Sequence, residues 1–363
     1  MTKIIISGGG TGGHIYPAIA IANALRELQP DVEILFVGAE GRMEMEKVPR
    51  AGYRIVGLPI AGIDRSNLLA NLSFPLKLVR SLIKAWALVR EFRPDAAVGV
   101  GGYASGPLLL AARWLGVPYL IQEQNSYAGI TNKSLASGAR KICVAYFGME
   151  VFFSADKIRL TGNPVRADLL DVTEKRPQAL AHFGLSANKK TLLVMGGSQG
   201  ARTLNESLET GLSQLLEAGH QVIWQTGKLF IDRARIVVES SGGTGVFVSD
   251  FINEMDLAYA AADAVVSRAG ALSVSELCLT GKPTIFVPLP TAAEDHQTKN
   301  ALTLVQAQAG LLVRDADARQ ELIAAALGLL QNADLQKNLS TNVQRLARPH
   351  AAREIAEEVL KMV

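Results

Sequence analysis

Residues 4–14 read IIISGGGTGGH, and this stretch decides the fold of the first half of the chain. The apolar run at residues 3–7 predicts a buried strand, and residues 15–28 (IYPAIAIANALREL) predict a helix. Between them, residues 8–13 hold five glycines and one threonine. Glycine costs backbone entropy on folding, so such a cluster indicates a tight turn or the close approach of another group. A strand, a glycine loop and a helix together form a corner whose amides and helix dipole attract an anion such as phosphate.

This loop can be compared with two nucleotide-binding motifs. Gly8, Gly10 and Gly13 fit the G-x-G-x-x-G pattern of dinucleotide-binding proteins, although that match alone has little specificity. No Lys-Ser/Thr pair follows, which excludes the P-loop of nucleoside triphosphatases. His14 closes the loop where the helix begins, and the positive end of the helix dipole favours a neutral ring that suits a general base. A capping or core histidine is the alternative.

Length and composition describe a large globular protein. With 363 residues, of which 48% are hydrophobic and 20% charged, two domains with large buried cores are expected. A net charge of +3 is too small to indicate nucleic-acid binding. Cys143 and Cys278 lie in apolar runs and are expected to be buried free thiols in a reducing compartment. Because a strand pattern starts at residue 3, no signal peptide is expected, and no apolar run approaches the ~18 residues of a membrane-spanning helix.

Strand-like and helical runs alternate along the chain. After the first strand, further strands are expected at residues 32–37, 96–100, 119–122 and 141–145. A polar stretch with two prolines, residues 161–178, is a candidate linker. Beyond it, strands are expected at residues 191–195, 221–225, 245–249, 264–267 and 284–287. This alternation predicts an α/β fold with parallel sheets, which bind ligands at the carboxyl ends of their strands.

Four junctions between a strand and a glycine loop divide evenly between the two halves. They lie at residues 4–14, 97–107 (AVGVGGYASGP), 191–208 (TLLVMGGSQGARTLNESL) and 264–283 (AVVSRAGALSVSELCLTGKP). Two junctions in each half indicate two Rossmann-like domains, each a doubly wound parallel sheet, facing a cleft. The C-terminal segment, residues 333–363, has a helical pattern and is expected to pack back across both domains.

Two of these loops in the second half carry side chains suited to a nucleotide. Glu276 lies one to two turns into the helix that follows residues 267–270, where its carboxylate can accept both hydrogen bonds of a ribose diol. Ser198 and the amides of residues 196–200 suit a diphosphate. A solvated helix glutamate and a simple tight turn are the structural alternatives.

Two polar clusters later in the chain have both a functional and a structural interpretation. Residues 293–300 (AEDHQTKN) offer Asp295, His296 and Gln297 to sugar hydroxyls, or Glu294 or Asp295 caps the next helix. Residues 315–317 (DAD) match a D-x-D motif for a metal–diphosphate, but they precede a helical run at residues 318–330, which favours capping. No group of His, Cys or acidic residues has the spacing of a metal site.

Further candidates lie in the first half and at the junction of the halves. Glu123 and Asn125 follow a strand within QEQN, residues 122–125, and form a second source of acid–base chemistry and hydrogen bonds. Arg166, within GNPVR, either binds a nucleotide or pairs with Asp168 at the surface.

Residues 71–93 (NLSFPLKLVRSLIKAWALVREFR) combine an apolar helical stripe with a basic one. The apolar stripe consists of Leu72, Leu76, Val79, Ile83 and Trp86, and the basic stripe of Lys77, Arg80 and Lys84. A basic amphipathic helix can lie on an anionic bilayer, where each basic residue contributes ~1 kcal/mol. A helix packed on the protein with a solvated basic face is the alternative.

Taken together, these motifs resemble a known enzyme family. They occur in one order and spacing at residues 8–18 (GGGTGGHIYPA), 101–107 (GGYASGP), 123–129 (EQNSYAG), 162–166 (GNPVR), 196–202 (GGSQGAR) and 268–276 (RAGALSVSE), followed by Gln297 and Asn300. Over nearly the whole chain they resemble members of glycosyltransferase family 28 that transfer N-acetylglucosamine (GlcNAc) from UDP-GlcNAc to undecaprenyl-pyrophosphoryl-MurNAc-pentapeptide. The resemblance implies the GT-B architecture, a step of peptidoglycan synthesis with a role in cell shape and division, inverting chemistry, no cofactor and no bound metal.

The resemblance also implies different roles for the two domains. Residues 1–163 would form the acceptor and membrane-associated domain, with a C-terminal helix at residues 346–363 packed back on it. Residues 164–345 would form the UDP-GlcNAc-binding domain. The partners would be UDP-GlcNAc, the lipid-linked acceptor and an anionic membrane surface, which implies a peripheral protein on the cytoplasmic face of the inner membrane.

Individual residues carry over by their positions in these motifs. Donor-binding residues would be Asn125, Arg166, Ser198, Ile252, Ala271, Leu272, Ser273, Val274, Ser275, Glu276 and Gln297, with Ile252 meeting uracil beside Phe251 and Glu276 holding the ribose. Thr11, Gly12 and Gly13 would lie near the reacting phosphates of the acceptor. His14 is the leading candidate for the base that deprotonates the acceptor C4 hydroxyl, and Glu123 is the second.

Two positions depart from the family pattern. Gln122 stands where the family usually has a histidine before Glu-Gln-Asn, so any role of that ring is absent here. The loop at residues 61–67 (AGIDRSN) is less basic than expected because Asp64 interrupts it. This departure concerns how the protein would contact a membrane and does not concern the reaction.

Two other classes of protein remain as alternatives. An NAD-dependent oxidoreductase would use the loop at Gly8, Gly10 and Gly13, but Glu40 follows Gly13 by 27 residues instead of the ~20 expected, and the matching loop at residue 196 would have no role. A non-catalytic nucleotide-sugar-binding or scaffold protein would bind UDP-GlcNAc without turnover.

Overall fold

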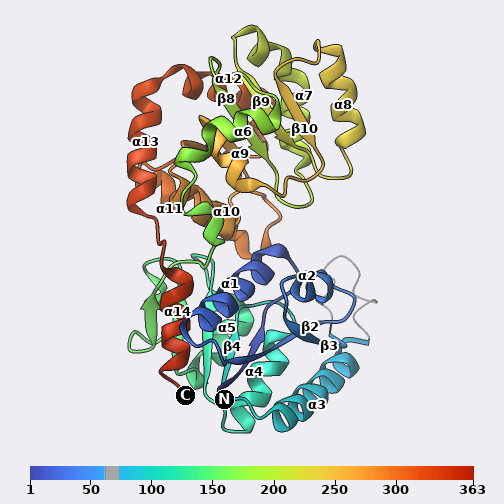
Figure 1. The fold of residues 1–363 in the computed structure, drawn as a ribbon, viewed down its shortest axis with the longest axis vertical. Coiled ribbons are helices and arrows are strands. Elements are labelled where there is room, and N and C mark those ends of the chain that lie inside the picture. Colours follow the sequence, from blue (N-terminus) through green and yellow to red (C-terminus); the bar gives the residue numbers. More distant parts are fainter. Residues whose placement is uncertain (61, 63–72) are drawn as a thin grey trace. The chain divides into compact units, whose positions relative to one another are not determined.

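The computed structural model describes residues 1–60, 62 and 73–363 (Figure 1). Within it the chain forms two compact units: unit 1 comprises residues 1–166 and 349–363, and unit 2 comprises residues 167–348. Apart from Gly62, the loop expected to be less basic (residues 61–67) lies outside the described residues, as do residues 71–72 of the amphipathic segment.

Unit 1 is built on a parallel sheet of seven strands in the order β3-β2-β1-β4-β5-β6-β7. The strands are β1 (Lys3–Ser7), β2 (Glu33–Ala39), β3 (Arg54–Leu58), β4 (Ala96–Gly99), β5 (Tyr119–Glu123), β6 (Lys141–Val144) and β7 (Ile158–Leu160). Its helices are α1 (Gly12–Leu28), α2 (Glu44–Arg50), α3 (Phe74–Phe92), α4 (Ser105–Trp114), α5 (Ile130–Leu135) and α14 (Ala351–Leu360).

Helices cover both faces of this sheet, which explains the continuous apolar run in β1. Ile4 and Ile6 belong to one buried cluster with residues of α1 and α14, whereas Ile5 belongs to a second cluster with residues of α3 and α4. Successive side chains of a strand point to opposite faces, so a strand covered on both sides needs apolar residues at every position.

Unit 2 repeats this plan with a parallel sheet of six strands in the order β10-β9-β8-β11-β12-β13. The strands are β8 (Thr191–Met195), β9 (Gln221–Gln225), β10 (Val246–Ser249), β11 (Ala264–Ser267), β12 (Thr284–Phe286) and β13 (Leu311–Leu312). The helices are α6 (Arg176–Phe183), α7 (Arg202–Glu217), α8 (Ile231–Ser240), α9 (Met255–Ala261), α10 (Ala271–Thr280), α11 (His296–Gln306), α12 (Ala318–Gln331) and α13 (Ala333–Arg345). Leu192 and Val194 of β8 share a buried cluster with Leu208 and Leu212 of α7.

The strand order of each sheet reverses at one point. In unit 1 the chain runs outward from β1 through β2 and β3, then returns to the other side of β1 with β4; in unit 2 the same reversal separates β8 from β11. Ligands of doubly wound sheets bind at such switch points, outside the carboxyl ends of the strands. The predicted pair of doubly wound parallel sheets is confirmed, and all four predicted glycine junctions follow the strands that flank these two points.

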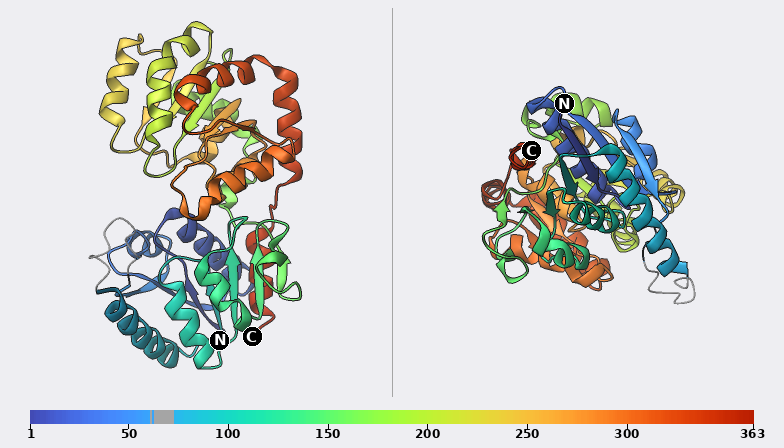
Figure 2. Two further views of the ribbon diagram at one scale, coloured as in Figure 1. Left: turned by 180° about the vertical axis from the view of Figure 1, so that it is seen from behind. Right: turned by 90° about the horizontal axis from the view of Figure 1, so that it is seen from below.

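The last helix of the chain belongs to unit 1. Ile355, Ala356 and Val359 of α14 are buried in the same cluster as Ile21 and Leu25 of α1. Consequently both chain termini lie at the same end of unit 1 (Figures 1 and 2). The preceding helix, α13, belongs to unit 2, where it packs against α10 and α12.

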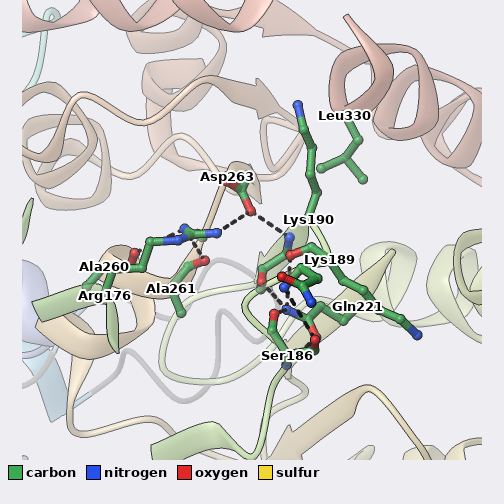
Figure 3. A network of polar contacts seen from close by, with 12 residues as sticks. Arg176, Ser186, Lys189, Lys190, Gln221, Ala260, Ala261, Asp263 and Leu330 are labelled. Atoms are coloured by element: carbon green, nitrogen blue, oxygen red, sulfur yellow. Dashed lines mark hydrogen bonds and ion pairs between the residues drawn. The ribbon is translucent and has the colours of Figure 1, made fainter. Parts of the chain in front are cut away.

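A polar network joins the amino ends of three strands of unit 2, β8, β9 and β11 (Figure 3). Asp263, just before β11, accepts hydrogen bonds from Arg176 Nη2 at 3.0 Å and from the backbone amide of Thr191 at 2.8 Å. Gln221 at the start of β9 donates to Ser186 O at 2.8 Å and to Thr191 Oγ1 at 2.9 Å. Because this network lies at the sheet edge opposite to the glycine loops, we infer that it stabilises the fold and takes no part in ligand binding.

Both cysteines are buried free thiols, as predicted. Burial raises the pKa of the Cys143 thiol in β6 and of the Cys278 thiol in α10 to about 12. Neither thiol is therefore poised to act as a nucleophile.

Candidate functional site

The first glycine loop of unit 1 connects β1 to α1. The helix begins at Gly12 with Thr11 as its N-cap residue, so the first amides of α1 have no acceptor within the helix. A Cβ atom at Gly8 would lie 2.7 Å from His14 O and 2.9 Å from Ala18 Cβ. Glycine at this position therefore lets the strand turn directly into the helix.

The second loop, after β4, packs against the first one backbone to backbone. Gly101 and Gly102 have φ values of +95° and +87°, which favour glycine. A Cβ at Gly102 would overlap the carbonyl oxygen of Gly9, and one at Gly101 would lie 2.5 Å from His14 Cδ2. Ser105 donates from Oγ to Ser7 O at 3.1 Å and to Gly101 O at 2.7 Å, which fastens the second loop to the end of β1.

His14 therefore lies in the first turn of α1, against the second loop. Its Nδ1 is 3.4 Å from Thr11 Oγ1, a contact whose donor depends on the tautomer, and the side chain is only partly buried. A half-buried imidazole at a helix N-terminus, beside amides that suit an anion, can accept a proton from a nearby hydroxyl. Its role as a base stays a prediction.

Glu123, the second candidate for the base, already receives several hydrogen bonds. It is buried at the end of β5, and its Oε1 accepts from the backbone amide of Asn125 at 3.1 Å. Its Oε2 accepts from the Gly129 amide at 3.0 Å and from Asn132 Nδ2 at 2.8 Å. This geometry suits a carboxylate that shapes the loop at residues 123–129, so we favour His14 as the base.

The departure at Gln122 has a structural explanation. Gln122 is buried and donates from Nε2 to Asn163 Oδ1 at 3.0 Å, while Asn163 Nδ2 donates to Gln124 O at 3.0 Å. The glutamine thus links the end of β5 to the segment after β7. Asn125 and the half-buried Arg166 also belong to unit 1, and their grouping with the donor-binding residues of unit 2 stays a prediction.

Unit 2 has its own pair of interlocked glycine loops. The loop at residues 196–200 follows β8, and Ser198 at its tip is exposed. Gly200 (φ +76°) would overlap Thr226 O if it carried a Cβ, and Gly227 (φ +75°) would overlap Gln199 O. The loops after β8 and β9 therefore pack as closely as the two loops of unit 1.

Helix α10 follows β11 at the switch point and presents the predicted residues 271–276 in its first turns. Gly270 is its N-cap residue, and Ser275 Oγ donates to Ala271 O at 3.0 Å. Glu276 Oε2 accepts a hydrogen bond from Tyr259 Oη at 2.8 Å, and Tyr259 itself is fully buried in α9. Tyr259 thus orients Glu276. The sequence does not single out Tyr259, because an aromatic residue in an apolar helix cannot be distinguished from an ordinary core residue.

Two more predicted residues lie at the same carboxyl edge. Gln297, in the first turn of α11, accepts a hydrogen bond from the Leu289 amide at 3.0 Å, which ties it to the loop after β12. Ile252, after β10, is 3% exposed, whereas Phe251 beside it is 37% exposed. Asp295 precedes α11 with a left-handed backbone (φ +54°), and no side-chain cap bond of Asp295 occurs within the described residues, so its suggested capping role is wrong.

The D-x-D sequence at residues 315–317 does not cap its helix either. Among described residues Asp317 makes no side-chain cap bond to α12. Asp315 instead pairs with Arg268 Nη1 at 2.5 Å and accepts from Thr203 Oγ1 at 3.1 Å. Arg268 also donates to Val287 O at 2.9 Å, so the pair joins the ends of β11, β12 and β13 to α7. Within the described ranges, no group of three His, Cys, Asp or Glu side chains is placed to hold a metal ion.

The two units match two consecutive family models. Residues 4–144 match the N-terminal domain of glycosyltransferase family 28, and residues 191–358 match the C-terminal domain of that family. The chain is 58% identical over 362 residues to a protein of Bacteroides fragilis and 56% identical over 361 residues to one of Parabacteroides distasonis. Both are named UDP-N-acetylglucosamine--N-acetylmuramyl-(pentapeptide) pyrophosphoryl-undecaprenol N-acetylglucosamine transferase. These alignments cover 99% of this chain and 95% and 98% of the two relatives.

Solved structures show the same architecture. The crystal structure of Acinetobacter baumannii MurG has a TM-score of 0.79 at 29% identity, covering 99% of this chain and all of that chain (100%). UDP-GlcNAc 2-epimerase from Neisseria meningitidis, with a TM-score of 0.70 at 15% identity over 99% of this chain and 100% of that one, shows a likeness of fold alone. Two doubly wound sheets with glycine loops at both switch points form the GT-B architecture, and the two family models show that this protein is a glycosyltransferase of that class. Within that class, the chain belongs to glycosyltransferase family 28.

Membership of this family confirms the predicted resemblance and decides against the oxidoreductase alternative.

Proposed function

We propose that the protein transfers GlcNAc from UDP-GlcNAc to the C4 hydroxyl of the MurNAc sugar in undecaprenyl-pyrophosphoryl-MurNAc-pentapeptide, a step of peptidoglycan synthesis. The observation that carries the proposal is the identity of 58% over 99% of the chain to a relative named for this transfer. The presence of an anion-binding corner in each unit supports it, because both substrates contain a diphosphate.

Unit 2 is the proposed donor site. Glu276, oriented by Tyr259, would accept hydrogen bonds from the ribose hydroxyls, and the amides of residues 196–200 with Ser198 would bind the diphosphate. Ile252 would meet the uracil through its backbone, and Gln297 would contact the GlcNAc hydroxyls. The first turn of α10, from Ala271 onward, would stabilise the charge of the departing UDP.

Unit 1 is the proposed acceptor site, with Thr11, Gly12 and Gly13 near the acceptor phosphates. The acceptor oxygen attacks C1 of GlcNAc from the face opposite UDP, its proton passes to His14, and the bond from C1 to the UDP oxygen breaks with its electron pair on UDP. The product is a β-1,4 linkage with inverted configuration at C1. General-base catalysis of this type contributes typically 10²–10⁴-fold.

We also propose that the reaction needs no bound metal ion, because amides and helix N-termini at both edges supply the positive potential that a diphosphate requires. The expected result is full activity after extensive treatment with a chelator. Loss of activity that added Mg²⁺ or Mn²⁺ restores would contradict this part of the proposal.

The exposed face of α3 is the proposed membrane contact. Leu76, Val79 and Ile83 are 56%, 52% and 64% exposed, and the basic residues Lys77 and Arg80 on the same helix are exposed too. Apolar side chains beside basic ones suit the interface of an anionic bilayer, where the lipid-linked acceptor resides. No described helix has the length and apolar character needed to cross a bilayer.

The test of the transfer is direct. Purified protein with labelled UDP-GlcNAc and the lipid-linked acceptor should form a labelled lipid product whose new bond a β-specific hexosaminidase cleaves. Binding of UDP-GlcNAc without any transfer would instead indicate a nucleotide-sugar-binding protein. For the membrane contact, exchanging Lys77 and Arg80 for glutamate should reduce binding to phosphatidylglycerol vesicles but leave UDP-GlcNAc binding unchanged.

A further inference from the structure

We propose that Glu44 is a positioning residue that holds the glycine loop at residues 8–13 in the conformation required for transfer. Glu44 was not among the candidates in the sequence, where it resembles an ordinary acidic residue in the first turn of a helix. The inference rests on the proposed function, because it concerns the acceptor-side loop of that same reaction.

The carboxylate of Glu44 joins two chain segments that are distant in sequence. The side chain is fully buried, at 0% exposure. Its Oε2 accepts a hydrogen bond from the Gly10 amide at 2.9 Å, and its Oε1 accepts one from the Ala39 amide at 2.9 Å. One carboxylate thus connects the middle of the glycine loop to the end of β2.

Two glycines form the space that holds this carboxylate. A Cβ atom at Gly9 would overlap the carboxyl group of Glu44, and one at Gly38 would lie 2.5 Å from Glu44 Cγ. Gly9 also contacts the second loop, since a Cβ at Gly102 would overlap its carbonyl oxygen. The backbone at Gly9 is therefore enclosed between Glu44 and Gly102, and its position depends on both.

The charge of Glu44 is compensated by backbone amides. Its hydrogen bonds within the described part of the chain come from two backbone amides, those of Gly10 and Ala39. Burying a carboxylate without hydrogen bonds is costly, so these two bonds must persist as long as the group stays charged and buried. The carboxylate consequently restrains the loop strongly.

This restraint decides which amides of the loop remain for a ligand. Gly10 has a left-handed backbone (φ +88°), and its amide is committed to Glu44. An anion at this corner is therefore left with the amides that follow, at residues 11–13, where α1 begins beside His14. A shift of the Gly10 turn would move both these amides and His14, and misplacement of catalytic groups by ~1 Å can cost on the order of 100-fold in rate.

The test uses Glu44→Gln, which keeps the shape of the side chain but turns one of the two acceptors into a donor. We expect kcat for transfer to fall by on the order of 10–100-fold and the KM of the lipid-linked acceptor to rise, while the Kd of UDP-GlcNAc stays within about twofold of the wild-type value. In hydrogen–deuterium exchange, the peptide at residues 8–14 should exchange faster, whereas the strand peptides of β1 and β2 should keep their protection.

Glu358→Gln is the matched control. Glu358 is a buried carboxylate of unit 1 as well, but it lies on α14 and pairs with Lys361 at 2.7 Å. We expect this control to retain wild-type kcat at temperatures at which both variants are folded. A wild-type kcat in Glu44→Gln would refute the positioning role. The role is also refuted if β1 and β2 of this variant lose their protection from exchange and its activity falls only as far as its folded fraction does. An inactive wild-type protein would instead refute the proposed function.

Discussion

The switch points of the two units have the same topology but are held together by different chemistry. In unit 1, two glycine loops pack backbone to backbone, and the buried carboxylate of Glu44 ties the first of them to the end of β2 by amide hydrogen bonds. In unit 2, the ion pair between Arg268 and Asp315 joins the strand ends. Each unit thus has one anion-binding corner, and the two corners differ in the side chains that surround them. A titratable ring, His14, borders the first corner, and a carboxylate, Glu276, borders the second.

The largest expected effect is on catalysis, and it comes from the histidine that borders only the corner of unit 1. Replacing His14 with alanine should lower kcat by about 10²–10⁴-fold and leave the affinity for UDP-GlcNAc unchanged, because the base acts on the acceptor hydroxyl. Steady-state kinetics with both substrates and calorimetry with UDP-GlcNAc measure the two effects. His182→Ala, which removes an exposed histidine of α6, is the control. An unchanged kcat in His14→Ala would remove His14 from this role.

The second prediction concerns the ion pair that holds the corner of unit 2. Asp315→Ala leaves the Arg268 guanidinium, whose side chain is 9% exposed, without its carboxylate and should destabilise unit 2 by about 3 kcal/mol. Denaturant unfolding followed by the fluorescence of the buried Trp224 measures this loss. Asp317→Ala removes the more exposed pair with Arg314 and should cost less than about 1 kcal/mol. Equal effects of the two substitutions would contradict the structural role of Asp315.

The third prediction sharpens the assignment of the donor to unit 2. Glu276→Gln should weaken UDP-GlcNAc binding by roughly 10–100-fold, since a charged acceptor of the ribose hydroxyls is lost. Tyr259→Phe removes only the hydrogen bond that orients Glu276 and should weaken binding a few-fold. Neither substitution should alter the KM of the acceptor by more than about twofold. If both variants bind the donor normally, Glu276 does not hold the ribose.

The smallest effect is a pH dependence that arises away from either corner. Burial lowers the pKa of Lys282 to about 8, and its Nζ donates to Ala262 O at 2.9 Å. An unfolded lysine titrates near 10.4, so between these values the unfolded state binds more protons and stability rises with pH. This contribution is about 1 kcal/mol between roughly pH 7 and pH 9. Lys282→Met should lack this rise, whereas Lys189→Met, at an exposed lysine, should keep it.

The sequence was sufficient to predict the central strands of each sheet and one edge strand, β10, but not the other three edge strands. Strands β1, β8 and β9 lie at the predicted residues because central strands buried on both faces are uninterrupted apolar runs. Strands β3, β7 and β13 were not predicted; they are short, partly exposed and lie at the sheet edges. Such strands pair with neighbours through their backbone and leave a weak pattern in the sequence.

The parts of the site that are formed by backbone amides, the glycine loops, could be predicted from the sequence. Each glycine loop stands immediately after its strand, so sequence order and local composition reveal it. The partners of these loops come from elsewhere in the chain: Glu44 lies 34 positions from Gly10, and Tyr259 lies 17 positions from Glu276. Only the folded chain brings such residues together. For the same reason the sequence around Asp315 favours a helix cap, whereas in the structure this residue pairs with Arg268.

The central claim is that the corner in unit 2 binds the sugar nucleotide and the corner in unit 1 does not. Hydrogen–deuterium exchange of the whole protein with saturating UDP-GlcNAc tests it most directly. We predict slower exchange in peptides that cover residues 196–200, 249–253 and 271–276, with the loops at residues 8–14 and 101–105 unchanged. Protection confined to the two loops of unit 1 would contradict the account.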